Sequence, residues 1–214
     1  MAGDFKAIRP HSGTEFDSVI EHLTHEAYRA RCRWDVLVAI EEAFDEYALE
    51  FNQTPSFWEL TRRALQDDLL VRLGRLYDPH PVATSLGNLL QTLKATVSRG
   101  GSVVPAYITT LCGADLDTDL ASISDQDNVI AKLLKVRHEY LAHRGKQHVK
   151  KGTFTAIPTL AEHELGRLVH KPIDLLVKYR RYLGYPLISW GHHEVDDLRQ
   201  LLKLVRAGSE QMGQ

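Results

Sequence analysis

Residues 125–146, DQDNVIAKLLKVRHEYLAHRGK, are the stretch from which the fold of this 214-residue chain can be worked out. On a helical wheel at about 100° per residue, the apolar side chains gather on one face, which predicts an amphipathic helix. Arg137 falls inside this apolar stripe, Arg144 falls near its middle, and His143 and His138 lie at its two edges. Because an unpaired buried charge costs several kcal/mol, an arginine in such a stripe needs a partner.

Two interpretations of Arg137 follow from this position. In the first, Arg137 reaches water from the end of the helix or pairs with a carboxylate of a neighbouring helix. In the second, the stripe faces a cleft or a partner, where Arg137 and His143 meet a ligand. In a straight helix these two side chains point about 120° apart, so they cannot contact each other within one helix. They can line one groove only if the helix frays before Gly145 or if two copies pack about a two-fold axis.

The composition is that of a single globular domain. Hydrophobic residues make up 43% of the chain, and the formal net charge is −2. The cysteines, Cys32 and Cys112, lie in separate segments without metal-type spacing, so neither a disulfide framework nor a structural zinc site is expected. We find no signal peptide and no membrane-spanning run, which favours a soluble, cytoplasmic protein without a membrane partner.

Basic side chains are concentrated in and after the central helix, although the whole chain is slightly acidic. Such a run is most often a solvated face, but a basic segment that contains histidines also suits a phosphate-binding surface. The basic residues of this segment are Lys132, Lys135, Arg137, Arg144, Lys146, Lys150 and Lys151. The last four of them are the candidates for phosphate binding beyond the central helix.

Helical patterns account for most of the chain. A seam of apolar residues over positions 16–51 predicts one long first helix, and residues 57–77 form a second that packs back on it as an antiparallel hairpin. A third helix is expected after Ser85, followed by a short apolar turn and an aspartate-rich loop at residues 115–127. This loop lacks the glycine and glutamate of a calcium site. No segment alternates like a strand, so the fold class is all-α, an antiparallel helical bundle.

The whole chain, residues 1–214, is expected to form one domain. Residues 1–13 read as a flexible arm, and residues 160–214 as C-terminal helices packed on the bundle, with Pro172 kinking or splitting the first of them and a short last helix. Neither of two histidine groups has the spacing of a metal site, so no metal and no cofactor is expected. The groups considered were His138, His143 and His148, and His192, His193 and Glu194.

The segment from Arg137 to His143, RHEYLAH, resembles the signature of the HEPN superfamily, an arginine and a polar residue followed after a short spacer by histidine. With Arg144 after it, the segment is similar to the form found in the abortive-infection (Abi U-type) branch. Residues 75–79, Arg-Leu-Tyr-Asp-Pro, resemble the R-x-x-D-P segment of the same branch. The resemblance covers residues 57–144.

Membership of that superfamily implies a HEPN-like helical bundle, a two-fold homodimer that brings two motif helices together, and metal-independent cleavage of RNA. His143 is then the base or acid, Arg137 the cation that holds the phosphate, and His138 the residue that orients them. The chemistry suits these residue types, because histidine exchanges protons near neutral pH and arginine stabilises charge on phosphorus. Arg144, Lys146, Lys150 and Lys151 extend the RNA-binding surface.

Three functions are compatible with these patterns. The first is a dimeric HEPN endoribonuclease, a toxin or phage-defence effector. The second is a non-catalytic HEPN module that binds nucleotide or a partner protein, such as a nucleotidyltransferase antitoxin. The third is a general helical interaction protein. Cleavage of RNA in the presence of EDTA separates the first from the other two.

Overall fold

The computed structural model describes residues 5–8, 10–99, 113–138, 160–186, 188, 191 and 193–212. All regular secondary structure in these ranges is helical, which confirms the expected fold class. None of the helices within them is long and apolar enough to cross a membrane. Their bounds are α1 Gly13–Ala43, α2 Ala48–Gln53, α3 Pro55–Leu76, α4 Leu86–Arg99, α5 Gly113–Ser122, α6 Asn128–Val136, α8 Glu162–Tyr182 and α9 His193–Met212.

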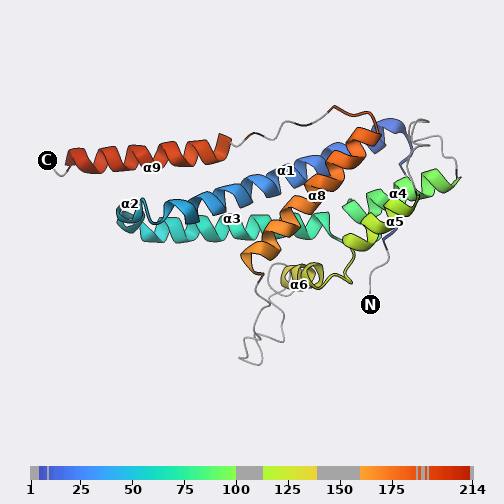
Figure 1. The fold of residues 1–214 in the computed structure, drawn as a ribbon, viewed down its shortest axis with the longest axis horizontal. Coiled ribbons are helices and arrows are strands. Elements are labelled where there is room, and N and C mark those ends of the chain that lie inside the picture. The colour runs from blue at the N-terminus through green and yellow to red at the C-terminus, as the bar shows by residue number, and fades with distance from the viewer. Residues whose placement is uncertain are drawn as a thin grey trace, which may run out of the picture.

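The predicted long hairpin is formed by α1 and α3, which lie side by side, and α8 packs across α1 (Figure 1). Apolar side chains at helical spacing on these three helices fill the main core, which α4, α5 and α6 extend. Its most deeply buried members include Phe16 and Leu23 of α1, Leu69 and Leu73 of α3, and Leu168 of α8.

The first helix is shorter than the apolar seam predicts. The seam continues to Phe51, but α1 ends at Ala43 and a turn leads into the separate helix α2. After α2 the connection to α3 is short, since α3 begins at Pro55, directly after Thr54. The turn brings Tyr47 and Phe51 onto Trp58 in a second, smaller core cluster.

The aspartate-rich segment is also different from the expectation, because residues 113–122 form helix α5 and not a loop. Leu116, Leu120 and Ile123 recur at helical spacing and are buried, and α5 packs against α4. Its acids pair with cations of neighbouring helices: Asp117 with Lys94, and Asp119 with Lys178.

Two C-terminal helices complete the described chain. Helix α8 runs from Glu162 to Tyr182 without being split at Pro172. Helix α9 is 20 residues long, not short, and buries Leu198 and Leu202 in the second core cluster. At the other end of the chain, residues 5–8 lie against α4 and do not form the expected free arm, since the Lys6 amide donates to Asn88 Oδ1 at 2.8 Å.

Candidate functional site

The site is organised by α6, the first part of the central helix. Asp127 caps its N-terminus by accepting hydrogen bonds from the amides of Val129 at 2.8 Å and Ile130 at 3.2 Å. Arg167 of α8 donates to the same carboxylate at 2.6 Å. Burial alone raises the pKa of Asp127, but the hydrogen bonds from Arg167 and from the two amides outweigh it, so the pKa lies below its usual value.

The apolar stripe of α6 faces the protein's own core. Ile130, Leu133 and Val136 are buried there, and Lys132 at the side of the stripe forms an ion pair with Glu164 of α8 at 2.6 Å. These contacts leave the buried part of the stripe covered within one chain. The stripe therefore gives no support to the expectation that this face meets a second copy.

Beyond Val136 the helical path widens into a π turn at residues 137–138, and Arg137 extends from it across α3. Its Nη1 donates to the carbonyl oxygen of Gly74 at 3.0 Å and contacts Asp78 Oδ2 at 2.7 Å. Arg137 thus has the carboxylate partner that the first interpretation predicts. It is nevertheless 34% exposed, so the guanidinium is not sealed in the core.

Gly74 is what allows this close approach. A Cβ at position 74 would lie 2.5 Å from Arg137 Cδ and 3.2 Å from Arg137 Cγ. The stem of the arginine therefore lies directly against the α3 backbone. Gly74 costs α3 up to about 1 kcal/mol in helix propensity relative to alanine, and the space it leaves is filled by Arg137.

Asp78 is held in place by the turn that follows α3. Its Oδ1 accepts from the amide of His80 at 2.9 Å. The buried Asn88 fixes this turn by donating to the carbonyl oxygens of His80 at 2.9 Å and Ala83 at 2.8 Å. On the other side, Tyr77 donates from its buried hydroxyl to the Leu168 carbonyl of α8 at 3.0 Å. The acceptor that fixes Arg137 is therefore anchored to α4 and α8.

The geometry leaves part of the guanidinium available. Within the ranges that the structure describes, both polar contacts of Arg137 are made by Nη1. Nη2 and Nε can then donate a pair of parallel hydrogen bonds, the arrangement with which arginine binds carboxylates and phosphates. The arrangement is suited to an anion that reaches the donors of Arg137 not used by Gly74 and Asp78.

Of the other predicted site residues, only His138 lies in a described range, and it is exposed on the π turn next to Arg137. His143, Arg144, Lys146, Lys150 and Lys151 lie outside the described residues. In the described ranges, no group of three or more histidines, cysteines or acids is arranged to hold a metal ion.

The R-x-x-D-P segment contributes more to the site than its resemblance alone suggested. Arg75 pairs with Glu26 of α1 at 3.6 Å, whereas Asp78 binds Arg137, so the two charged residues of the segment face different neighbours. Gly74 and Asp78 were not predicted as site residues. The available signal was a glycine inside the helical pattern, four positions before the aspartate of this segment.

The comparison with protein families agrees with this geometry. A family model of HEPN type described as AbiU2 matches residues 13–201, which includes every helix up to the first half of α9. No curated protein and no solved structure was found to match the chain. The matched range contains both the Arg137 segment and the Asp78 segment that binds it. The chain therefore belongs to the AbiU2 family of the HEPN superfamily.

Proposed function

We propose that this protein is a metal-independent endoribonuclease that acts as a toxin or phage-defence effector. The observation that carries the proposal is the anchoring of Arg137, whose Nη1 is fixed by Gly74 and Asp78 while the side chain stays partly exposed. Such a cation is held in place before a phosphate arrives, which is how an electrostatic site lowers a reaction barrier. Family membership supports the same function.

The proposed reaction is an attack of the ribose 2′-hydroxyl on the adjacent phosphorus. His143 removes the 2′-hydroxyl proton, and Nη2 and Nε of Arg137 stabilise the negative charge that builds on the phosphorane oxygens. The P–O5′ bond then breaks, the departing 5′-oxygen takes a proton from water, and the proton held by His143 returns to solvent. The products are a 2′,3′-cyclic phosphate and a 5′-hydroxyl, so the reaction needs neither a metal ion nor a cofactor. His138 orients the two reacting groups.

The proposal includes a homodimer, in which Arg137 of one copy and His143 of the other act on the same phosphodiester. In a two-fold dimer, each site combines groups from both copies. The support for the dimer is the AbiU2 family membership. The apolar stripe of α6 does not add support, because its buried part is covered within one chain. Arg144, Lys146, Lys150 and Lys151 are proposed to contact the RNA backbone, which makes binding dependent on salt.

Cleavage of fluorescently labelled single-stranded RNA and transfer RNA in EDTA tests the proposal. We expect Arg137→Ala to slow cleavage at least about 100-fold, because a single charge-stabilising donor contributes about that much. His143→Ala should be equally inactive. Lys135→Ala is the matched control, because Lys135 is an exposed cation on the same helix and should tolerate the change.

Thermal melts of each variant separate catalysis from folding. If Arg137→Ala does not fold, Arg137→Lys replaces it, since lysine keeps the charge but loses the paired donors. The reaction should change between pH 5 and 8, because an unperturbed histidine has a pKa of about 6.5. A folded wild-type protein that cleaves neither RNA would show that the chain is instead a non-catalytic HEPN module that binds nucleotide or an antitoxin. Complete loss of cleavage on chelation would contradict the metal-independent mechanism.

A further inference from the structure

A second surface of interest lies at the end of the hairpin opposite α6 (Figure 1). We call this surface the hairpin tip and define it as residues 40–62 together with residues 206–210 of α9. It contains the end of α1, the whole of α2 and the first turns of α3 (Figure 1). None of the proposed ribonuclease residues belongs to it.

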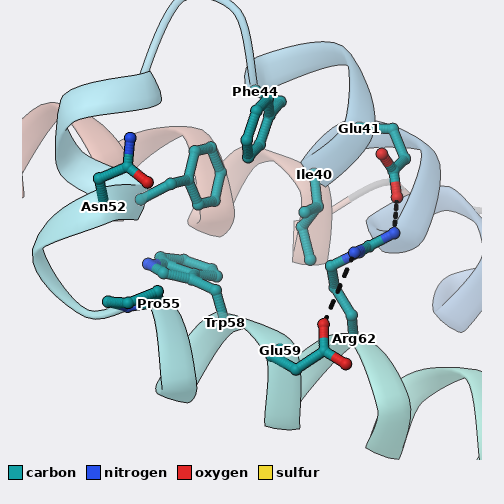
Figure 2. Close-up of a pocket in the computed structure, with 9 residues that line it drawn as sticks. Ile40, Glu41, Phe44, Asn52, Pro55, Trp58, Glu59 and Arg62 are labelled. Carbon is teal, nitrogen blue, oxygen red and sulfur yellow. Dashed lines mark hydrogen bonds and ion pairs between the residues drawn. The ribbon is translucent and has the colours of Figure 1, made fainter.

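A cavity of about 320 Å³ opens between α1, α2 and α3 at the hairpin tip (Figure 2). Phe51 and Trp58 meet edge to face with ring centroids 4.7 Å apart, and Phe44 stacks on Phe51 at 5.6 Å. Phe51 and Trp58 are buried, but Phe44 remains 51% exposed at the mouth. The cavity is thus lined by aromatic rings and is accessible to an apolar side chain.

Polar groups border the same cavity. Arg62 lies between two carboxylates, forming a hydrogen-bonded ion pair with Glu41 and a looser one with Glu59 at 3.9 Å (Figure 2). Both acids are more than half exposed, so they also face solvent. Glu59 is also paired with Arg63 at 2.9 Å, so the negative charge of the tip comes mainly from its other carboxylates.

Apolar side chains extend the surface beyond the cavity. Leu49, Phe57 and Leu60 are all more than half exposed and belong to the tip, although they do not line the cavity. Of the nine large apolar side chains that are exposed in the described ranges, these three and Phe44 fall within residues 44–60. A concentration of this kind is typical of a protein-binding surface, whereas isolated exposed apolar residues are common everywhere.

A second hollow on the other side of α2 adds to the negative charge. It lies between α2 and α9, where Arg206 binds Glu50 at 2.7 Å and so lowers the pKa of that carboxyl. Together the two hollows are lined by six carboxylates and two guanidiniums, although the formal charge of the whole chain is only −2. The carboxylates are Glu41, Asp45, Glu46, Glu50, Glu59 and Glu210.

The hairpin tip is separate from the Arg137 site. Trp58 lies in the first turn of α3 and Gly74 in its last, so the cavity and the Arg137 contact are about 24 Å apart along the helix. A molecule bound at the tip does not cover Arg137. The two surfaces also have opposite charge, since the proposed RNA site is basic.

We propose that the hairpin tip binds a partner protein through a basic segment that places one large apolar side chain in the aromatic cavity. Charge complementarity selects this occupant. Carboxylates repel the phosphates of RNA and of anionic lipid, and they repel the same acidic face of a second copy. The exposed apolar residues of the tip lie partly outside the cavity, where a small molecule in the cavity does not reach them. A buried anchor with a charged rim is how protein interfaces are built.

The test uses the full chain and a fluorescein-labelled peptide of alternating lysine and alanine with one central tryptophan. Two matched peptides replace lysine with glutamate or tryptophan with alanine. Fluorescence anisotropy should show saturable binding of the first peptide only, weakening as salt is added. In ¹⁵N spectra the shifted amides should lie in residues 40–62.

Variants of exposed residues locate the binding surface. Phe44→Ala should weaken binding at least tenfold and Glu42→Lys severalfold, whereas Val82→Ala and Asp174→Lys, exposed positions away from the tip, should bind like wild type. Phe44→Leu replaces Phe44→Ala if that variant fails to fold. Absence of saturable binding, equal binding of the glutamate peptide, or amide shifts around Arg137 and Gly74 would overturn the proposal. None of these measurements depends on ribonuclease activity.

Discussion

Replacing Gly74 with alanine changes the position of Arg137 without removing any charge. The new Cβ would lie 2.5 Å from Arg137 Cδ, which is closer than carbon atoms approach each other. Cδ is in the middle of the side chain, so the arginine cannot relieve the clash by moving only its tip. We therefore expect Arg137 to leave Gly74 and to lose its contact with Asp78.

The free energy of unfolding should change little. Alanine favours a helix over glycine by up to about 1 kcal/mol. Against this stands the loss of an ion pair that is neither fully exposed nor fully buried, with side chains 34% and 16% exposed, for which about 1 to 2 kcal/mol is reasonable. The two effects nearly cancel, so the melting temperature should shift by no more than a few degrees.

RNA cleavage should respond far more strongly, falling by about 100-fold because the cation no longer lies where charge develops on phosphorus. Gly208→Ala is the matched control: it is the same substitution inside a helix, but a Cβ there meets open space. That variant should be slightly more stable and fully active.

A folded Gly74→Ala protein with the wild-type cleavage rate would refute the role assigned to the Arg137 contact. Adding Gly74→Ala to Arg137→Ala provides a second check. If both act through the same guanidinium, the double variant should be no slower than Arg137→Ala alone. Additive losses would mean that Gly74 affects the reaction by another route. Should the wild type lack activity, the ¹⁵N signals of the Arg137 guanidinium still report whether Gly74→Ala displaces it.

Three further expectations concern folding, pH and assembly. Leu73→Ala should lower the free energy of unfolding by about 2 to 5 kcal/mol in urea titrations, because Leu73 is fully buried between the hairpin helices. Asp127→Ala should cost about 1 kcal/mol at neutral pH through loss of the α6 cap. Since the pKa of Asp127 is lowered in the folded protein, its carboxylate stabilises the fold above the unfolded pKa of about 4, and the deficit of the alanine variant should shrink as the pH falls below that value. Analytical ultracentrifugation at tens of micromolar should give a dimer, and a monomer there would contradict the proposed two-copy site.

The parts of the fold that follow from local spacing could be predicted from the sequence. The apolar seam of α1 and the leucines of α3 indicate the hairpin, because residues three and four apart share a helical face. The end of α1 could not be predicted, because the same spacing continues through the turn at residues 44–47. Apolar spacing indicates which face of a helix is buried and not where the chain turns. Helix α5 was mistaken for a loop because its aspartates were read as loop composition, although Leu116, Leu120 and Ile123 keep helical spacing.

The candidate site could be predicted only in part, because its residues come from distant parts of the sequence. Arg137 stood out because a charge interrupts an apolar stripe, which is visible within one helix. Its partner is 59 positions earlier in the chain, and nothing local to either residue specifies that the end of α3 meets the end of α6. The role of Gly74 is even harder to predict, because the sequence alone does not show which part of the backbone a long side chain will contact.

The two interpretations of Arg137, a structural ion pair and a ligand-binding group, do not exclude each other. A fully buried arginine has no donor to offer a substrate, and a freely mobile one must lose rotamer entropy when it binds. Holding Nη1 against Gly74 and Asp78 removes much of that mobility in advance, while the side chain as a whole stays 34% exposed. The negative charge of Asp78 partly cancels the positive potential of Arg137. The arrangement therefore fixes the position of the cation but weakens its attraction for a phosphate. A fixed cation suits the proposed reaction, because binding that is equally strong in the ground state and the transition state does not accelerate cleavage.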